Sequence, residues 1–101
     1  MTRPVVVLPE AEQDLAEAFT WYEEQRAGLG GAFLNEAASL FDRLGKFPLA
    51  FPVVEDPFRR GFLKRFPFAA YFLVDTAQTP AVYAVLHYRR DPGIWKERLS
   101  L

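Results

Sequence analysis

The sequence predicts an α+β fold, in which a hairpin of two helices packs on one face of a mainly antiparallel sheet. Apolar residues follow a helical period through most of the first half of the chain. After Pro57 they give way to runs of aromatic and β-branched residues, which favour strands. Helices gathered in one part of a chain and strands in another are typical of this class. The expected order is β-α-α-β-β-β, in one domain over residues 1–101.

The first expected elements are a short strand and a long helix. Residues 5–8 read Val-Val-Val-Leu and are closed by Pro9, which indicates a strand. Pro9 also suits the first turn of a helix, where acidic residues follow it. Over residues 10–25 the apolar positions share one helical face. They are Ala11, Leu15, Ala18, Phe19 and Tyr22. Trp21 falls on the opposite, acidic face, which is unusual for so large a side chain.

A second helix is expected over residues 32–46. Gly28, Gly30 and Gly31 predict a tight break before it, so that the two helices form an antiparallel hairpin. Its apolar residues form two neighbouring stripes, and a face this wide must be covered on more than one side. One stripe is Phe33, Ala37, Leu40 and Leu44, and the other is Leu34, Ala38 and Phe41.

The second half of the chain predicts three consecutive strands. Two Phe-Pro pairs, at residues 47–48 and 51–52, end the second helix and begin a loop that reaches Pro57. The strands are expected over residues 59–66, 68–75 and 81–88, and short links make them antiparallel. The sheet face away from the helices should remain open and carry several cations. Residues 94–101 are expected to form a short final helix or turn, anchored by Trp95.

Composition excludes several classes of protein. The chain has no cysteine, which excludes disulfides and thiolate metal sites, and we expect neither a metal nor a cofactor. The apolar run at residues 5–8 is far too short for a signal peptide or a membrane span. We therefore expect a cytoplasmic protein without a membrane partner.

The charge is small in total but unevenly distributed. The net charge is −1, which argues against nucleic acid as the main partner. Residues 1–55 carry four basic and nine acidic groups, whereas residues 56–101 carry eight basic and four acidic groups. The two parts have net charges of −5 and +4, so we expect two distinct surfaces.

Several segments, taken in order, resemble the RelE/ParE superfamily, the toxins of bacterial type II toxin–antitoxin systems. The resemblance spans about residues 3–98 and depends on the ordered set, because no single segment is specific. The segments are Trp21-Tyr22-Glu23-Glu24-Gln25 with Gly28-Leu29-Gly30 and Phe33-Leu34; Phe47-Pro48 and Phe51-Pro52; Arg59-Arg60 with Leu63, Arg65-Phe66-Pro67-Phe68 and Tyr71; and Val85-Leu86-His87 with Arg89-Arg90-Asp91-Pro92 and Trp95.

The resemblance implies a class of function and leaves the mechanism open. RelE-like toxins cut mRNA on the ribosome without a metal, whereas ParE-like toxins inhibit DNA gyrase and have no nuclease activity ascribed to them. Both are neutralised by a cognate antitoxin whose C-terminal segment wraps the toxin. The resemblance therefore implies a plasmid-stabilisation or growth-arrest role and an antitoxin partner, with a homodimer or a toxin–antitoxin hetero-oligomer as the assembly.

A nuclease would need a general base, a general acid and cations around the phosphate. His87 is the single histidine, and its ordinary pKa suits either proton role. In that hypothesis His87, Arg60 and Arg65 are the catalytic residues. Against it, His87 and Tyr88 should point to opposite faces of a strand, and a lone histidine is more often structural. The slightly acidic chain also fits RNA binding poorly.

A protein-binding toxin needs an interface instead. Trp21 is the best candidate anchor, unless it packs under the loop around Phe51. Cations on the strands can equally serve to discourage aggregation of sheet edges. The uncharged stretch 66–74 has high β-propensity and is expected to need cover from a partner. The residues predicted to contact target or antitoxin are Trp21, Arg59, Arg60, Lys64, Arg65, Arg89, Arg90 and Trp95.

Three hypotheses follow. The first is a ParE-like toxin that binds a protein such as DNA gyrase and has no active site. The second is a RelE-like, ribosome-dependent mRNA endonuclease. The third is a member that binds its antitoxin but has lost toxicity.

Overall fold

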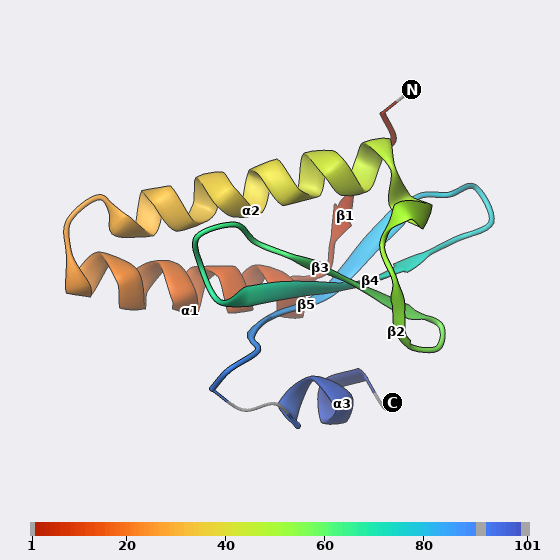
Figure 1. Ribbon diagram of the computed structural model, residues 1–101. Helices are drawn as coiled ribbons and strands as arrows, with labels where there is room; N and C mark the ends of the chain where they lie inside the picture. The colour runs from red at the N-terminus through yellow and green to blue at the C-terminus, as the bar shows by residue number, and fades with distance from the viewer. Residues whose placement is uncertain (1, 91–92, 100–101) are drawn as a thin grey trace.

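The computed structural model describes residues 2–90 and 93–99 and has the predicted α+β architecture (Figure 1). The helices α1 and α2 form an antiparallel hairpin on one face of the sheet, and the short α3 lies on the opposite face. The elements are β1 (Val6–Val7), α1 (Pro9–Gln25), α2 (Leu29–Lys46), the 3-10 helix η1 (Pro48–Ala50), β2 (Val53–Glu55), β3 (Phe58–Phe62), β4 (Phe68–Val74), β5 (Pro80–His87) and α3 (Ile94–Leu99).

The sheet has five strands in the order β1-β5-β4-β3-β2. Strands β2 to β5 pair antiparallel, as the short links predict, and β1 pairs parallel with β5. β4 is the central strand, and five of its seven residues are buried. The stretch 66–74 was expected to need cover from a partner, and this expectation is wrong, because the neighbouring strands and both helical layers of the chain cover it.

The main core lies between the helix hairpin and the sheet. Phe33, Leu40 and Leu44 of α2 are fully buried against Phe72 and Val82 of the sheet. Aromatic rings pack edge to face at the turn end of the hairpin, where Tyr22 meets Phe66 with ring centroids 4.9 Å apart.

The second apolar stripe of α2 was expected to be covered, and it is covered only in part. Phe41 packs against the core, whereas Leu34 is 38% exposed and Ala38 is also exposed.

Gly28, Gly30 and Gly31 were all expected to lie between the two helices. Gly28 does precede α2, but Gly30 and Gly31 lie in its first turn, because α2 starts at Leu29 and not at residue 32. Gly28 supplies the left-handed turn, with φ +90°. Gly30 lies where α2 closely approaches the backbone of α1, because a Cβ atom there would be 2.7 Å from the Phe19 carbonyl oxygen. The Glu23 carboxylate accepts hydrogen bonds from the N–H groups of Gly28 and Gly30 and so caps the start of α2.

Two sheet boundaries differ from expectation. Residues 53–55 were expected in a loop, and they form the edge strand β2 because they pair with β3. β3 ends at Phe62 and not at residue 66, since Leu63 to Phe68 form a tight turn in which Arg65 has φ 70°.

The far face of the sheet was expected to be open, and α3 covers part of it. Tyr71 pairs with Ala84 and Phe72 with Val82, so Tyr83 is the extra residue of a β-bulge. Tyr83 and Ala84 therefore both face α3, where Leu99 is buried with them. Trp95 anchors α3 as predicted, stacking on Tyr71 with centroids 5.1 Å apart.

Among residues 2–90 and 93–99, no helix combines the length and the apolar composition that crossing a bilayer would require. Within the same described part of the chain, no group of three or more histidine or acidic side chains could hold a metal ion.

Candidate functional site

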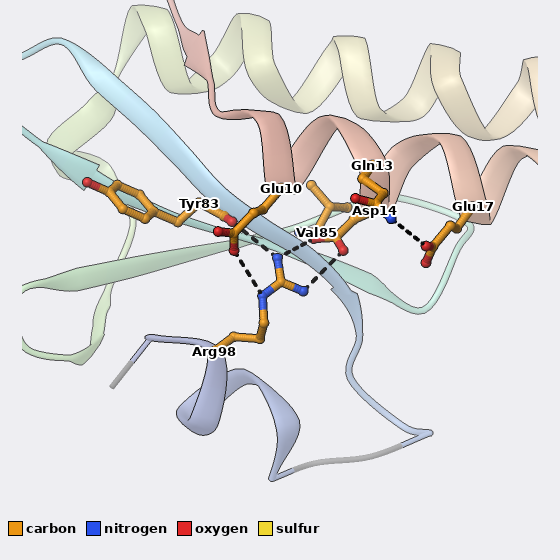
Figure 2. A network of polar contacts seen from close by, with 7 residues as sticks. All are labelled: Glu10, Gln13, Asp14, Glu17, Tyr83, Val85 and Arg98. Carbon is orange, nitrogen blue, oxygen red and sulfur yellow. Dashed lines mark hydrogen bonds and ion pairs between the residues drawn. The ribbon is translucent and has the colours of Figure 1, made fainter. Parts of the chain in front are cut away.

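A polar network fastens α3 to the open edge of β5 (Figure 2). The Asp14 carboxylate on α1 accepts hydrogen bonds from both terminal nitrogens of Arg98, at 3.1 and 2.9 Å, and from the backbone N–H of Val85, at 3.0 Å. Arg98 also donates to the Tyr83 carbonyl oxygen at 3.4 Å. The Asp14 hydrogen bonds raise the pKa of Arg98, against the opposing effect of burial.

This network occupies the part of the β5 edge along which β1 does not pair. β1 pairs with β5 only as far as Val82, so beyond that residue the edge of β5 opposite β4 faces no neighbouring strand. Unpaired backbone groups at a sheet edge can template pairing with another chain. Asp14 and Arg98 satisfy the Val85 N–H and the Tyr83 carbonyl, and so cover these two backbone groups of the edge.

Beside the network, α1, the end of β5 and the start of α3 enclose a pocket of about 380 Å³. Its wall is mainly aromatic and aliphatic, and includes Trp21, Tyr22 and Phe68. His87 and Arg90 line the end nearest the C-terminus of β5. Pockets of this kind, apolar with a few polar groups, are the usual form of binding sites.

Trp21 stands at the edge of this pocket and is 44% exposed. Its ring meets Tyr22 edge-on at 5.0 Å, and the Arg90 guanidinium lies over it at 5.4 Å from the centroid. The alternative position under the loop is wrong, since Phe51 packs against Phe72 instead. Trp21 is thus available as an anchor for a partner.

His87 ends β5 and fastens the turn that follows. Its Nδ1 atom accepts hydrogen bonds from the backbone N–H groups of Arg89 and Arg90, at 3.2 and 3.0 Å. Burial lowers the pKa of His87, and the charges of Arg90 and Arg89 lower it further. The ring is therefore neutral at pH 7, with its proton on Nε2. A base needs a free lone pair, and this ring has none, so the geometry favours a structural histidine.

His87 and Tyr88 point to opposite sides, as strand alternation predicts. The His87 ring packs against Phe68 on the helix side, with centroids 5.2 Å apart. Tyr88 belongs to the cluster under α3 and meets Phe62 edge-on at 5.2 Å. These two residues therefore cannot serve one site as acid and base.

The predicted cations do not converge on one site. Arg59 donates to the Phe51 carbonyl at 2.6 Å, which fastens the loop before β2. Lys64 and Arg65 are exposed in the turn between β3 and β4. Arg90 lies over Trp21, on the side of α1. The proposed catalytic set of His87, Arg60 and Arg65 is thus divided, with His87 and Arg60 on opposite faces of the sheet.

Arg60 and Arg89 do share the α3 face of the sheet. The Arg60 guanidinium lies 4.8 Å from the Phe62 centroid, and Arg89 lies 5.9 Å from that of Tyr88. Since Phe62 and Tyr88 touch, these four side chains form a continuous row.

Tyr71 lies deeper on this face, with its hydroxyl buried and without a hydrogen-bond partner among the described residues. Burial raises the pKa of Tyr71, and the neighbouring Arg60 side chain opposes this, first through its polar approach to the hydroxyl, which falls short of a well-formed hydrogen bond, and then through its charge.

Asp14 and Arg98 were not among the residues predicted from sequence. They lie 84 positions apart, and each resembles an ordinary charged residue of an exposed helix face. A weak signal was present, because Asp14 lies only one turn from Ala11 and Ala18 on the apolar face.

Comparison with known proteins supports the fold. No family model matches this chain, and no curated protein matches it. Among solved structures, a chain described as the chromosomal ParDE TA system from P. aeruginosa aligns with a TM-score of 0.63. That alignment covers 85% of this chain and 96% of the other, at 15% sequence identity. The two chains therefore share a fold.

Proposed function

We propose that this chain, over residues 1–101, is the toxin of a type II toxin–antitoxin pair. The observation that carries the proposal is the fold shared with a ParDE-system chain over 85% of this sequence. The sequence resemblance to RelE/ParE toxins points to the same class. A cognate antitoxin is the partner that this role requires.

We further propose a ParE-like mode of action, in which the chain binds a protein target such as DNA gyrase and performs no chemistry on it. The division of His87, Arg60 and Arg65 supports this, because a nuclease needs its proton donors and cations around one phosphate. The exposed Trp21 beside a mainly apolar pocket supports protein binding, since tryptophan is enriched among interface anchors.

A supercoiling assay with purified protein and DNA gyrase tests this mode. Inhibition at near-stoichiometric toxin, relieved by the protein encoded beside the gene, is the expected result. Full gyrase activity at excess toxin would exclude gyrase as the target. Expression of the chain alone, without growth arrest, would favour the third hypothesis, a member that has lost toxicity.

The ribosome-dependent endonuclease is the second candidate, and one feature favours it. The row formed by Arg60, Phe62, Tyr88 and Arg89 combines cations with aromatic rings, as surfaces that stack unpaired bases do. Such a nuclease would use Tyr88 and the arginines of this face in place of His87. It predicts mRNA cuts on translating ribosomes, abolished by Tyr88→Phe and retained in His87→Asn.

A further inference from the structure

The pocket between α1 and β5 is electrically asymmetric. At its α1 end the carboxylates are engaged, since Asp14 binds Arg98 and Val85, and Glu17 accepts a hydrogen bond from Gln13. At the other end Arg90 forms no ion pair with any residue that the structure describes. Its charge acts on the pocket wall, where it lowers the pKa of His87 and opposes the burial that raises the pKa of Tyr22.

His87 keeps Arg90 at this position. Its Nδ1 atom accepts a hydrogen bond from the backbone N–H of Arg90. The preceding residue, Arg89, lies against Tyr88 on the other face of the sheet. The guanidinium of Arg90 lies over the Trp21 ring instead of in open solvent. A cation ordered in this way against an aromatic wall loses little further entropy when it binds an anion.

The outer side of Trp21 has the opposite charge. A second, shallower hollow there is lined by Glu17, Thr20 and Glu24. Glu17 lines both hollows and Glu24 lines only the outer one, so the glutamates lie along α1 whereas the Arg90 cation lies over the Trp21 ring at the end of β5. If a ligand covers Trp21, its negative groups would be repelled by the glutamates on the α1 side and attracted by Arg90 on the β5 side.

We propose that this pocket binds one apolar side chain of a partner protein, with a carboxylate of the same segment paired to Arg90. The partner is an acidic, amphipathic segment of the antitoxin, and this identification rests on the proposed function. The apolar side chain packs against Trp21, Tyr22 and Phe68. The carboxylate lies beside Arg90 on the β5 side of Trp21, away from Glu24, and the Glu17 end of the pocket receives only the apolar part of the segment. The neutral His87 is a positioning residue, which acts through the turn that carries Arg90.

Two adjacent arginines provide a matched test. Arg90→Glu reverses the charge at the pocket, whereas Arg89→Glu makes the same chemical change on the opposite face. Both residues are exposed, so both variants should fold, which circular dichroism checks. The first probe is a fluorescein-labelled peptide with one phenylalanine flanked by glutamates, and its control carries lysines in place of the glutamates. The second probe is the full-length protein encoded beside the gene.

Arg90→Glu should weaken binding of the glutamate peptide by about tenfold or more, and Arg89→Glu by less than about twofold. Trp21→Ala should weaken it as strongly as Arg90→Glu. The lysine peptide should bind poorly to the wild-type protein and better to Arg90→Glu. Equal effects of the two arginine variants, or no binding of the glutamate peptide to the wild type, would overturn the pocket assignment.

The full-length probe separates this proposal from the proposed function. If the neighbour-encoded protein binds the wild type and both arginine variants equally, the pocket assignment is wrong and the toxin–antitoxin function stands. If that protein does not bind the wild type at all, the proposed function fails. In that case the peptide measurements alone test the pocket assignment.

Discussion

Replacing Asp14 by alanine removes three hydrogen bonds at once, two from Arg98 and one from the Val85 backbone. The Asp14 and Arg98 side chains are 12% and 26% exposed, so the pair lies between surface and buried ion pairs. Exposed pairs contribute about 0.2–1 kcal/mol, and breaking a buried pair costs about 3–5 kcal/mol. We expect Asp14→Ala to lower the free energy of unfolding by about 2–3 kcal/mol, because it also leaves the Val85 N–H without its partner.

A double-mutant cycle isolates the interaction between the two side chains. Arg98→Met keeps the aliphatic part of the side chain and removes the guanidinium, so it should cost about 1–2 kcal/mol. The double variant should reveal a coupling energy of about 1–2 kcal/mol between Asp14 and Arg98. Urea unfolding followed by circular dichroism measures all four proteins, and a common slope shows that the same transition is compared.

An internal control lies on α2, where Lys46 and Asp42 form an ion pair at 3.0 Å with both side chains about half exposed. Its coupling energy should be about 0.3–0.5 kcal/mol, as for other exposed pairs one helical turn apart. If the coupling of Asp14 with Arg98 is no larger than that of this control, the network does not fasten α3, and our account of the β5 edge is wrong.

Three further predictions follow. Gly30→Ala should destabilise the protein by about 1–3 kcal/mol because its Cβ meets the Phe19 carbonyl, whereas Gly31→Ala should stabilise it by about 0.5–1 kcal/mol; thermal unfolding checks both. Folding lowers the pKa of His87, so the stability it contributes is present above its unfolded pKa of about 6.5 and is lost as pH falls through the lower folded value. His87→Asn should remove this loss in urea titrations between pH 7 and 5. Tyr71→Phe should be neutral or stabilising by up to about 1 kcal/mol, since it removes a buried hydroxyl without a partner, and a larger loss in urea unfolding would contradict this.

Local patterns were sufficient to predict the helix hairpin and the three long strands. The helical period records which side of each helix is buried, and runs of aromatic and β-branched residues indicate the strands; both kinds of information lie within a few neighbouring residues. The same reasoning mistook Gly30 and Gly31 for a break. Glycine weakens a helix, but at Gly30 the close approach of α1 requires it, and Glu23 caps the start of α2. This close approach is a tertiary feature that helix propensity does not contain.

The features that sequence reasoning missed all depend on distant partners. β2 has three residues and exists because β3 offers an edge to pair with. The bulge at Tyr83 turns two successive side chains toward α3, which no alternating pattern can predict. Asp14 meets Arg98 only when the last helix folds back over the sheet, and its spacing along α1 indicates only that Asp14 lies near the apolar face, without indicating its partner.

The charge division of the sequence has a particular meaning at Trp21. The acidic first part of the chain supplies Glu24 on the outer side of this residue and Glu17 on both sides, and the basic second part supplies Arg90 at the end of β5. In the sequence Arg90 was one of several cations and Trp21 was the best candidate anchor, but nothing in the sequence placed the two together. The fold places them 5.4 Å apart, over a pocket, because the His87 turn and α1 meet there. A partner that binds this pocket by charge must therefore place its anionic group beside Arg90 and keep it away from Glu17 and Glu24, which favours an ordered peptide segment over a diffuse anionic surface such as a nucleic acid backbone.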